Sequence, residues 1–184
     1  MNTKGMNMFL SEDNIKRHCE HLKTLKLRFS ILEKSLSQPL ENDINQILKM
    51  NIEREVKSEA SELLWKIKSH ELFFSSFSEK QVVNGKMLNG TISKEKFLYD
   101  IFVELSDKDY GFFYVCLNNR GQPYTVFTQR FDGAFLKYSP ILALDLYEHT
   151  YFCDYGFDKK RFLKSALTYL DLSLLDNSAE KMYN

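Results

Sequence analysis

The stretch Ser-Pro-Ile-Leu-Ala-Leu-Asp-Leu-Tyr-Glu-His-Thr-Tyr-Phe, residues 139–152, carries the most specific pattern in this chain. An apolar run ends at Asp145, and His149 follows four residues later. If the segment were helical, the two side chains would share a face and could bind one metal ion. A carboxylate beside an imidazole suits iron or manganese better than a structural zinc site, which favours thiolates. Taken alone, such a pair is more often a solvated aspartate and a packed histidine.

The longer string Asp-Leu-Tyr-Glu-His-Thr-Tyr, residues 145–151, resembles the Asp-x-Trp-Glu-His-Ala-Tyr signature of the iron/manganese superoxide dismutases. His18, in Asn-Ile-Lys-Arg-His-Cys-Glu-His, resembles the metal-binding histidine of the family's first helix. His70, in Ser-His-Glu-Leu-Phe-Phe, resembles the one on its second helix. Tyr-Gly-Phe-Phe-Tyr at 110–114 is similar to the family's Gly-Trp-x-Trp strand. The resemblance covers roughly residues 9–172.

The resemblance implies that His18, His70, Asp145 and His149 bind one iron or manganese ion per subunit. It also implies that the protein converts superoxide to O₂ and H₂O₂, with Asp145 hydrogen-bonded to solvent on the metal. Tyr147 replaces the family's Trp against the metal.

The residue before His149 also has a counterpart in the family. The resemblance implies that Glu148 reaches across the interface of a homodimer to the metal-binding histidine of the other subunit. Considered without the resemblance, Glu148 could instead be a solvated charge near a helix start, because the helix dipole favours an acidic residue there.

The chain departs from the family at several positions near the expected metal. Leu22 and Lys26 stand four and eight residues after the first ligand, where the family has a gateway His and a substrate-funnel Tyr. The outer-sphere Gln is replaced by Lys66 at one of its family locations, and Gln129 lies near the other. We expect Lys26 to lie beside the channel to the metal, where its charge would attract superoxide.

The expected catalytic residues are therefore Asp145, Tyr147, Lys26 and Gln129. Two alternatives stay open. The chain could keep the fold, with or without metal, in a structural or interaction role with little dismutase activity. It could also be a metalloenzyme of another kind, with Leu22 and Lys26 forming a changed substrate entrance.

The composition bears on the core, the expected partners and the expected compartment of the protein. The 184 residues are 43% hydrophobic, enough for a core without disulfides or metal staples. Because 25 basic residues balance 25 acidic ones, neither nucleic acid nor an anionic membrane is expected as a partner. An odd number of cysteines and the absence of a signal-peptide pattern at residues 1–8 predict a cytoplasmic protein.

The pattern along the chain predicts an α+β protein. We expect an antiparallel helical hairpin in residues 1–85, followed by an α/β domain in residues 86–184 with a small three-stranded antiparallel sheet. The turn signals Asn84-Gly85 and Asn89-Gly90 suggest the boundary. The expected helices are 11–36, 41–77, 93–105, 148–155 and 161–174, and the expected strands are 112–117, 124–131 and 141–144.

Overall fold

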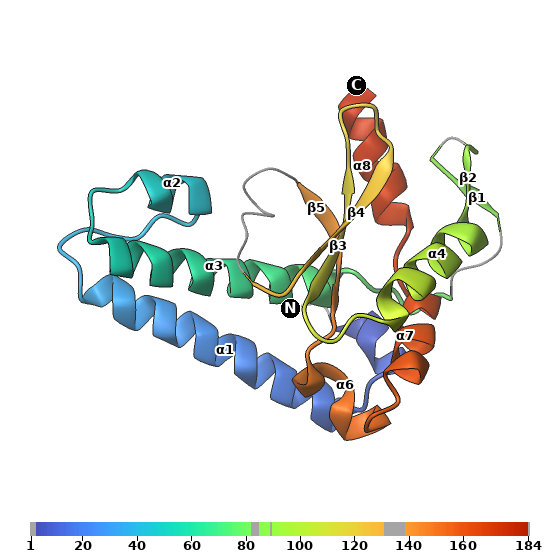
Figure 1. The fold of residues 1–184 in the computed structure, drawn as a ribbon, viewed down its shortest axis with the longest axis horizontal. Coiled ribbons are helices and arrows are strands. Elements are labelled where there is room, and N and C mark those ends of the chain that lie inside the picture. Colours follow the sequence, from blue (N-terminus) through green and yellow to red (C-terminus); the bar gives the residue numbers. More distant parts are fainter. Residues whose placement is uncertain (1–2, 82–84, 89, 131–138, 184) are drawn as a thin grey trace.

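The computed structural model describes residues 3–81, 85–88, 90–130 and 139–183 (Figure 1). Within these ranges the helices are α1 (Glu12–Lys34), α2 (Ile44–Lys49), α3 (Arg54–Ser75), α4 (Lys94–Ser106), α6 (Glu148–Tyr155), α7 (Lys159–Thr168) and α8 (Ser173–Tyr183), preceded by a 3-10 helix at Lys4–Met8. The strands there are β1 (Lys86–Met87), β2 (Ile92–Ser93), β3 (Phe112–Leu117), β4 (Pro123–Thr128) and β5 (Pro140–Asp145).

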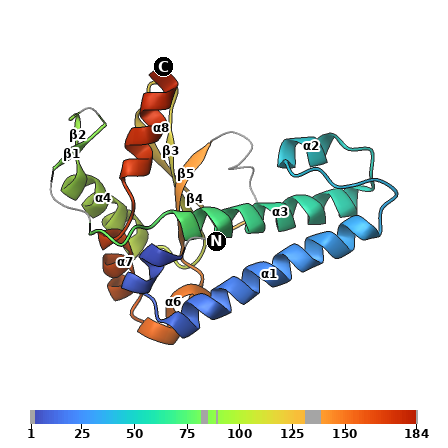
Figure 2. The ribbon, with the colours of Figure 1, turned by 180° about the vertical axis from the view of Figure 1, so that it is seen from behind.

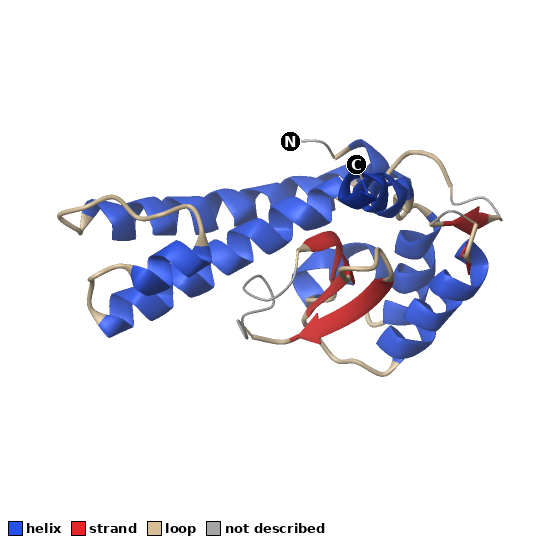
Figure 3. Ribbon diagram, turned by 90° about the horizontal axis from the view of Figure 1, so that it is seen from above, coloured by secondary structure: helices blue, strands red, loops and turns tan. Residues whose placement is uncertain are grey.

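The N-terminal part is a long antiparallel pair of helices, α1 and α3 (Figures 1 and 3). α1 begins where Ser11 Oγ accepts a hydrogen bond from the backbone N–H of Asn14. Two acidic residues in its first turn interact favourably with the positive end of the helix dipole. The structure has two helices where one was expected over residues 41–77. Asp43 caps the short helix α2, and the backbone is extended at Met50, between α2 and the start of α3. The expected hairpin is otherwise present.

The C-terminal part contains an antiparallel sheet with strand order β4-β3-β5, as expected from the sequence. β3 lies in the centre, and its first five residues are at most 1% exposed, so both faces of this strand are packed. Gly111, just before β3, has a φ of +146°, and a Cβ there would lie 2.5 Å from the carbonyl oxygen of Thr128. Only glycine therefore lets β3 approach β4 this closely at its start. The α+β fold class is confirmed.

Helices cover the sheet, and α8 stands beside β5 (Figure 2). One closing helix was expected at 161–174, but α7 ends at Thr168 and α8 begins at Ser173. The small β1–β2 hairpin was not expected at all. Residue 131, the expected end of the second strand, and residues 84 and 89 of the turn signals lie outside the described residues, and the boundary near residue 85 stays a prediction. None of the described helices is both long and apolar enough to cross a membrane.

The two parts are joined at the outer edge of β5 by the residues that follow α3. The buried Ser76 Oγ accepts a 2.8 Å hydrogen bond from the backbone N–H of Ala143 in β5. The backbone oxygen of Ser76 accepts from the N–H of Asp171, and Ser78 N–H donates to the oxygen of Tyr169. The end of α3 thus satisfies one backbone N–H of β5 and is bonded to the segment between α7 and α8.

Replacing Ser76 by Ala should destabilise the protein by about 1–3 kcal/mol, because the buried N–H of Ala143 loses its acceptor. Ser75→Ala is the matched control, since the neighbouring Ser75 is exposed and its hydroxyl donates to the local Leu72 carbonyl. Urea unfolding of both variants measures the difference. Equal stabilities of the two variants would contradict the proposed role of Ser76.

Candidate metal centre

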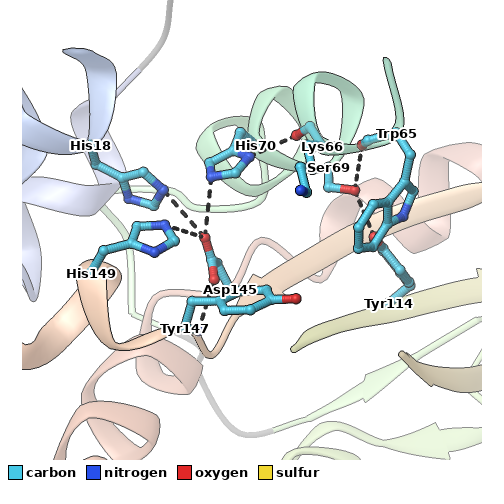
Figure 4. A network of polar contacts seen from close by, with 9 residues as sticks. All are labelled: His18, Trp65, Lys66, Ser69, His70, Tyr114, Asp145, Tyr147 and His149. Carbon is cyan, nitrogen blue, oxygen red and sulfur yellow. Dashed lines mark hydrogen bonds and ion pairs between the residues drawn. The ribbon is translucent and has the colours of Figure 1, made fainter. Parts of the chain in front are cut away.

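Four side chains from four segments converge where the helical hairpin meets the sheet (Figure 4). His18 comes from the second turn of α1, His70 from α3, Asp145 from the end of β5, and His149 from the start of α6. The Nε2 atoms of His18 and His149 each lie 3.3 Å from Asp145 Oδ2, and Nε2 of His70 lies 3.6 Å away. One candidate ligand atom from each residue lies within 4.8 Å of all the others.

This spacing fits a single metal ion. Bonds of about 2.0–2.2 Å to N and O ligands place neighbouring ligand atoms roughly 3–4.3 Å apart. The buried side-chain atoms without a hydrogen-bond partner in the described chain include both ring nitrogens of His18, Nε2 of His70 and Oδ2 of Asp145. Three of these atoms, Nε2 of His18, Nε2 of His70 and Oδ2 of Asp145, lie close together. Because unpaired buried polar atoms are costly, they indicate a bound cation that would satisfy all three. The residues fit a metal.

Hydrogen bonding fixes the orientation of the second-helix histidine. His70 Nδ1 donates to the carbonyl oxygen of Lys66 at 2.6 Å, which leaves Nε2 as the lone-pair nitrogen facing Asp145. Burial, with His18 and His149 adding to it, lowers the pKa of His70 to about 4, so this ring is neutral near pH 7. A neutral imidazole held in this way is the form that binds metals.

The carboxylate of Asp145 is fully buried and supplies the negative charge of the cluster. Burial alone would raise its pKa, but His149, His18 and His70 together lower the pKa of Asp145 well below its ordinary range. Burial acts to lower the pKa of His149, yet the facing Asp145 carboxylate raises it. Without a cation the cluster thus favours a proton on His149, which metal binding would displace.

Asp145 and His149 meet by a route other than one helical face. Asp145 is the last residue of β5 and pairs with Phe112, whereas His149 lies in the first turn of α6. Between them the backbone N–H of Tyr147 donates to Asp145 Oδ1 at 2.9 Å. This bond occupies the oxygen that faces away from the histidines and so aims Oδ2 at the cluster. The four-residue spacing therefore connects a strand end to a helix start, and does not place the two residues on one helix.

Tyr147 packs against the cluster from the side of the sheet. Its ring stacks with that of His149, with 5.8 Å between centroids, and meets Phe112 at 5.6 Å. The hydroxyl donates to the backbone oxygen of Gln129 at 2.8 Å. Burial and the nearby Asp145 raise the pKa of Tyr147 to about 12, so the phenol stays protonated at neutral pH.

A cavity of about 610 Å³ opens beside the cluster. His70, His149 and Tyr147 line its inner end, and Gln129 and Lys66 also contribute to its wall. No hydrogen bond joins the side-chain amide of Gln129 to the four clustered residues within the described structure. The structure thus brings Gln129 to the cavity without placing it on the cluster.

The structure gives Leu22 and Lys26 positions away from the cavity. Leu22 is buried in the hydrophobic core. Lys26 does not line the cavity, and its half-exposed ammonium pairs with Glu71 at 2.6 Å. Eight residues after His18 correspond to about 800° of helical rotation, roughly 80° from the same face. The pair with Glu71 holds the Lys26 side chain outside the cavity lining.

His21 also lies at the site, although the sequence pattern was not expected to place it there. Its ring lies 4.8 Å from that of His149 and 5.1 Å from that of His70, and it lines the cavity without joining the group of four. Burial, followed by the neighbouring His149 and His18, lowers the pKa of His21. The spacing of His18 and His21, three residues apart and so on adjacent positions of one helix face, could have indicated it.

The fold and these residues define a class of protein, a helical hairpin and an α/β domain with a candidate single-metal site between them. Residues 93–177 match the family model of the C-terminal domain of iron/manganese superoxide dismutases. This match assigns the C-terminal part of the chain to the iron/manganese superoxide dismutase family. The match includes Asp145 and His149, whereas His18 and His70 precede it and are brought to the site by the fold. No curated protein matches the chain.

A polar clamp fixes α6 to the start of α1 and so sets the distance between His149 and His18. Asp154 Oδ2 accepts hydrogen bonds of 2.9 Å from the backbone N–H of Ser11 and from Nδ2 of Asn14. The fully buried Asn14 also donates to the backbone oxygen of Thr150. Burial alone would raise the pKa of Asp154, but the bonds from Ser11 and Asn14 lower it.

Replacing Asp154 by Asn, which removes the charge, should cost about 1–2 kcal/mol of stability at pH 7. Because the folded pKa is lowered, the charge stabilises the fold fully above the unfolded pKa of about 3.9. The stabilisation is then lost as pH falls through the folded pKa. The difference between wild type and Asp154→Asn should hold from pH 8 to 6 and shrink below about pH 4, as measured by urea unfolding.

The control for this experiment is Asp100→Asn, which removes an exposed carboxylate whose ion-pair partner among the described residues is Lys96 on the same helix. It should change stability by less than about 0.5 kcal/mol. An Asp154→Asn protein as stable as this control at pH 7 would rule out the clamp.

Proposed function

We propose that the protein is a metal-dependent superoxide dismutase with one iron or manganese ion held by His18, His70, Asp145 and His149. The observation that carries the proposal is the convergence of three imidazoles on one buried carboxylate oxygen, with unpaired lone pairs facing each other. The match of residues 93–177 to the family's C-terminal domain supports superoxide as the substrate.

When bound, the ion supplies one-electron redox chemistry, in which two superoxide anions and two protons give O₂ and H₂O₂. The protein contributes the setting. Asp145 offsets part of the positive charge, His70 is held in its metal-binding tautomer by the Lys66 carbonyl, and Tyr147 presents a neutral phenol beside the site. Tyr147 would orient small molecules at the inner end of the cavity.

The cavity gives the substrate a route to the site. Arg28, Lys66 and Arg130 line its walls together with one acid, Glu62, so the lining is net positive. This charge favours entry of a small anion, and the attraction should weaken with salt. The family's gateway His and funnel Tyr are replaced by Leu22 and Lys26, neither of which reaches the cavity. We therefore expect dismutation below the family's usual rate. If turnover is absent, a structural or interaction role of the same fold replaces it.

We further propose a homodimer with Glu148 at the contact, in a reducing compartment such as the cytoplasm. Glu148 is exposed next to His149 and lines a surface hollow of about 550 Å³ with Tyr110 and Tyr151. A two-fold interface would repeat each contact by symmetry. Cys19, Cys116 and Cys153 are free thiols, which supports the compartment.

Replacing Asp145 by Ala should lower iron and manganese content at least tenfold, because the cluster loses its only carboxylate. His149→Ala should do the same. His21→Ala is the matched control, since this histidine lies beside the cluster but outside the group of four. Elemental analysis of purified, folded protein measures all three variants.

A superoxide-consumption assay on the same preparations tests turnover. Consumption should rise with metal content across the wild type and the two ligand variants. Metal occupancy that survives Asp145→Ala would overturn the site, and full occupancy without consumption would overturn the dismutase activity while leaving the metal site.

The dimer makes a separate prediction. Sedimentation at micromolar concentration should show the wild type as a dimer, and Glu148→Ala should raise the dissociation constant at least tenfold. Glu180→Ala, an exposed acid on α8, is the control and should stay dimeric. A monomeric wild type would contradict the proposal.

A further inference from the structure

The cavity beside the candidate metal centre is much larger than superoxide needs. Its volume is about 610 Å³, whereas a water-sized species occupies roughly 30 Å³. Pockets that hold organic ligands run from about 300 to 1,000 Å³. Most of this space therefore has no part in holding a diatomic anion, and the question is what its walls would recognise.

The cavity is elongated along the helical hairpin. On α1 it is lined by His21, Leu25 and Arg28, which are spaced by four and three residues and share one helix face. On α3 it is lined by Ser58 and His70 at its two ends. Twelve residues separate these two, about 18 Å along the axis of a helix. The space thus extends from the metal cluster towards the far end of the hairpin.

The floor of the cavity is apolar. Leu25 on α1, Trp65 on α3 and Phe112 on β3 contribute to its lining, and each is at most 4% exposed. Trp65 is the single tryptophan of the chain. The floor residues are already buried, so the gain comes from the ligand, whose own hydrocarbon surface leaves water when an apolar segment lies against this floor.

Two of the three Lys and Arg side chains that line the cavity have acidic partners. Lys66 pairs with Glu62 at 2.6 Å, and Arg28 lies 3.7 Å from Glu59. The guanidinium of Arg130 has no ion-pair partner in the described part of the chain. Arg130 follows Gln129, whose backbone binds Tyr147, so its chain position is at the metal end. A planar guanidinium there is suited to a carboxylate.

We propose that this cavity binds an organic monocarboxylate with an extended apolar tail. The carboxylate pairs with Arg130 near the metal end, and the tail lies over Leu25 and Trp65 towards Ser58. The site goes beyond the proposed dismutase function and does not depend on a metal for its affinity. It makes the entrance to the metal centre sensitive to such compounds.

The test uses octanoate as the probe, with acetate and 1-octanol as matched compounds that lack the tail or the charge. Because Trp65 is the only tryptophan, its fluorescence reports occupancy of the cavity. Octanoate should change this fluorescence saturably at sub-millimolar concentration. It should bind roughly tenfold more tightly than 1-octanol, and acetate should give no saturable change.

Two variants locate the ligand. Arg130→Gln should weaken octanoate about tenfold and leave 1-octanol unchanged. Lys26→Gln is the control, since it removes a cation of α1 that does not line the cavity, and it should bind octanoate like the wild type. Ser58→Phe, at an exposed helix position, should fill the far end and weaken octanoate more than the shorter butanoate.

The outcomes distinguish binding in the cavity from non-specific binding at the protein surface. No saturable fluorescence change with octanoate, or equal losses in Arg130→Gln and Lys26→Gln, would overturn the proposal. Metal content is measured on the same samples, so the two proposals fail separately. Protein that holds its metal and ignores octanoate refutes only this site, and metal-free protein that binds octanoate refutes only the dismutase proposal.

Discussion

One buried carboxylate oxygen organises this protein. Asp145 Oδ2 has imidazole nitrogens from α1, α3 and α6 within 3.3–3.6 Å, and its side chain is fully removed from water. A buried charge in that position is tolerable only if its neighbours compensate it. The three histidines do so in part, and a cation would complete the compensation. The hairpin, the sheet edge and α6 must all be in place for this, so the site depends on the whole tertiary structure.

The hydrogen bonds that hold the clustered side chains in place also come from several segments of the chain. Tyr147 N–H holds the second oxygen of Asp145, the Lys66 carbonyl holds the ring of His70, and Asp154 ties α6 to α1. None of these partners is itself one of the four clustered residues. Each restricts the rotation of a clustered side chain or the position of its helix, which is the usual way that protein metal sites are kept in geometry.

The sequence predicted the fold class, the central strand and the start of α1, because Ser11 and the acids after it are a local signal for a helix start. It also indicated the four residues that converge, through resemblance to a family signature. Local patterns could not predict the orientation of Lys26, because Glu71, which holds it, comes from another helix. They also missed the break between α7 and α8, where Asp171 N–H bonds to Ser76 across the fold.

The edge of β5 has a consequence for how the chain reaches its native state. An open strand edge is a template for pairing with other chains, and proteins usually cover or charge such edges. Here Ser76, just after α3 and more than sixty residues before β5, satisfies one backbone N–H of β5. Because the ribosome makes the N-terminal part first, this acceptor exists before the strand that it bonds. A fragment that lacks the hairpin would lack this acceptor and would leave the Ala143 N–H open to pairing.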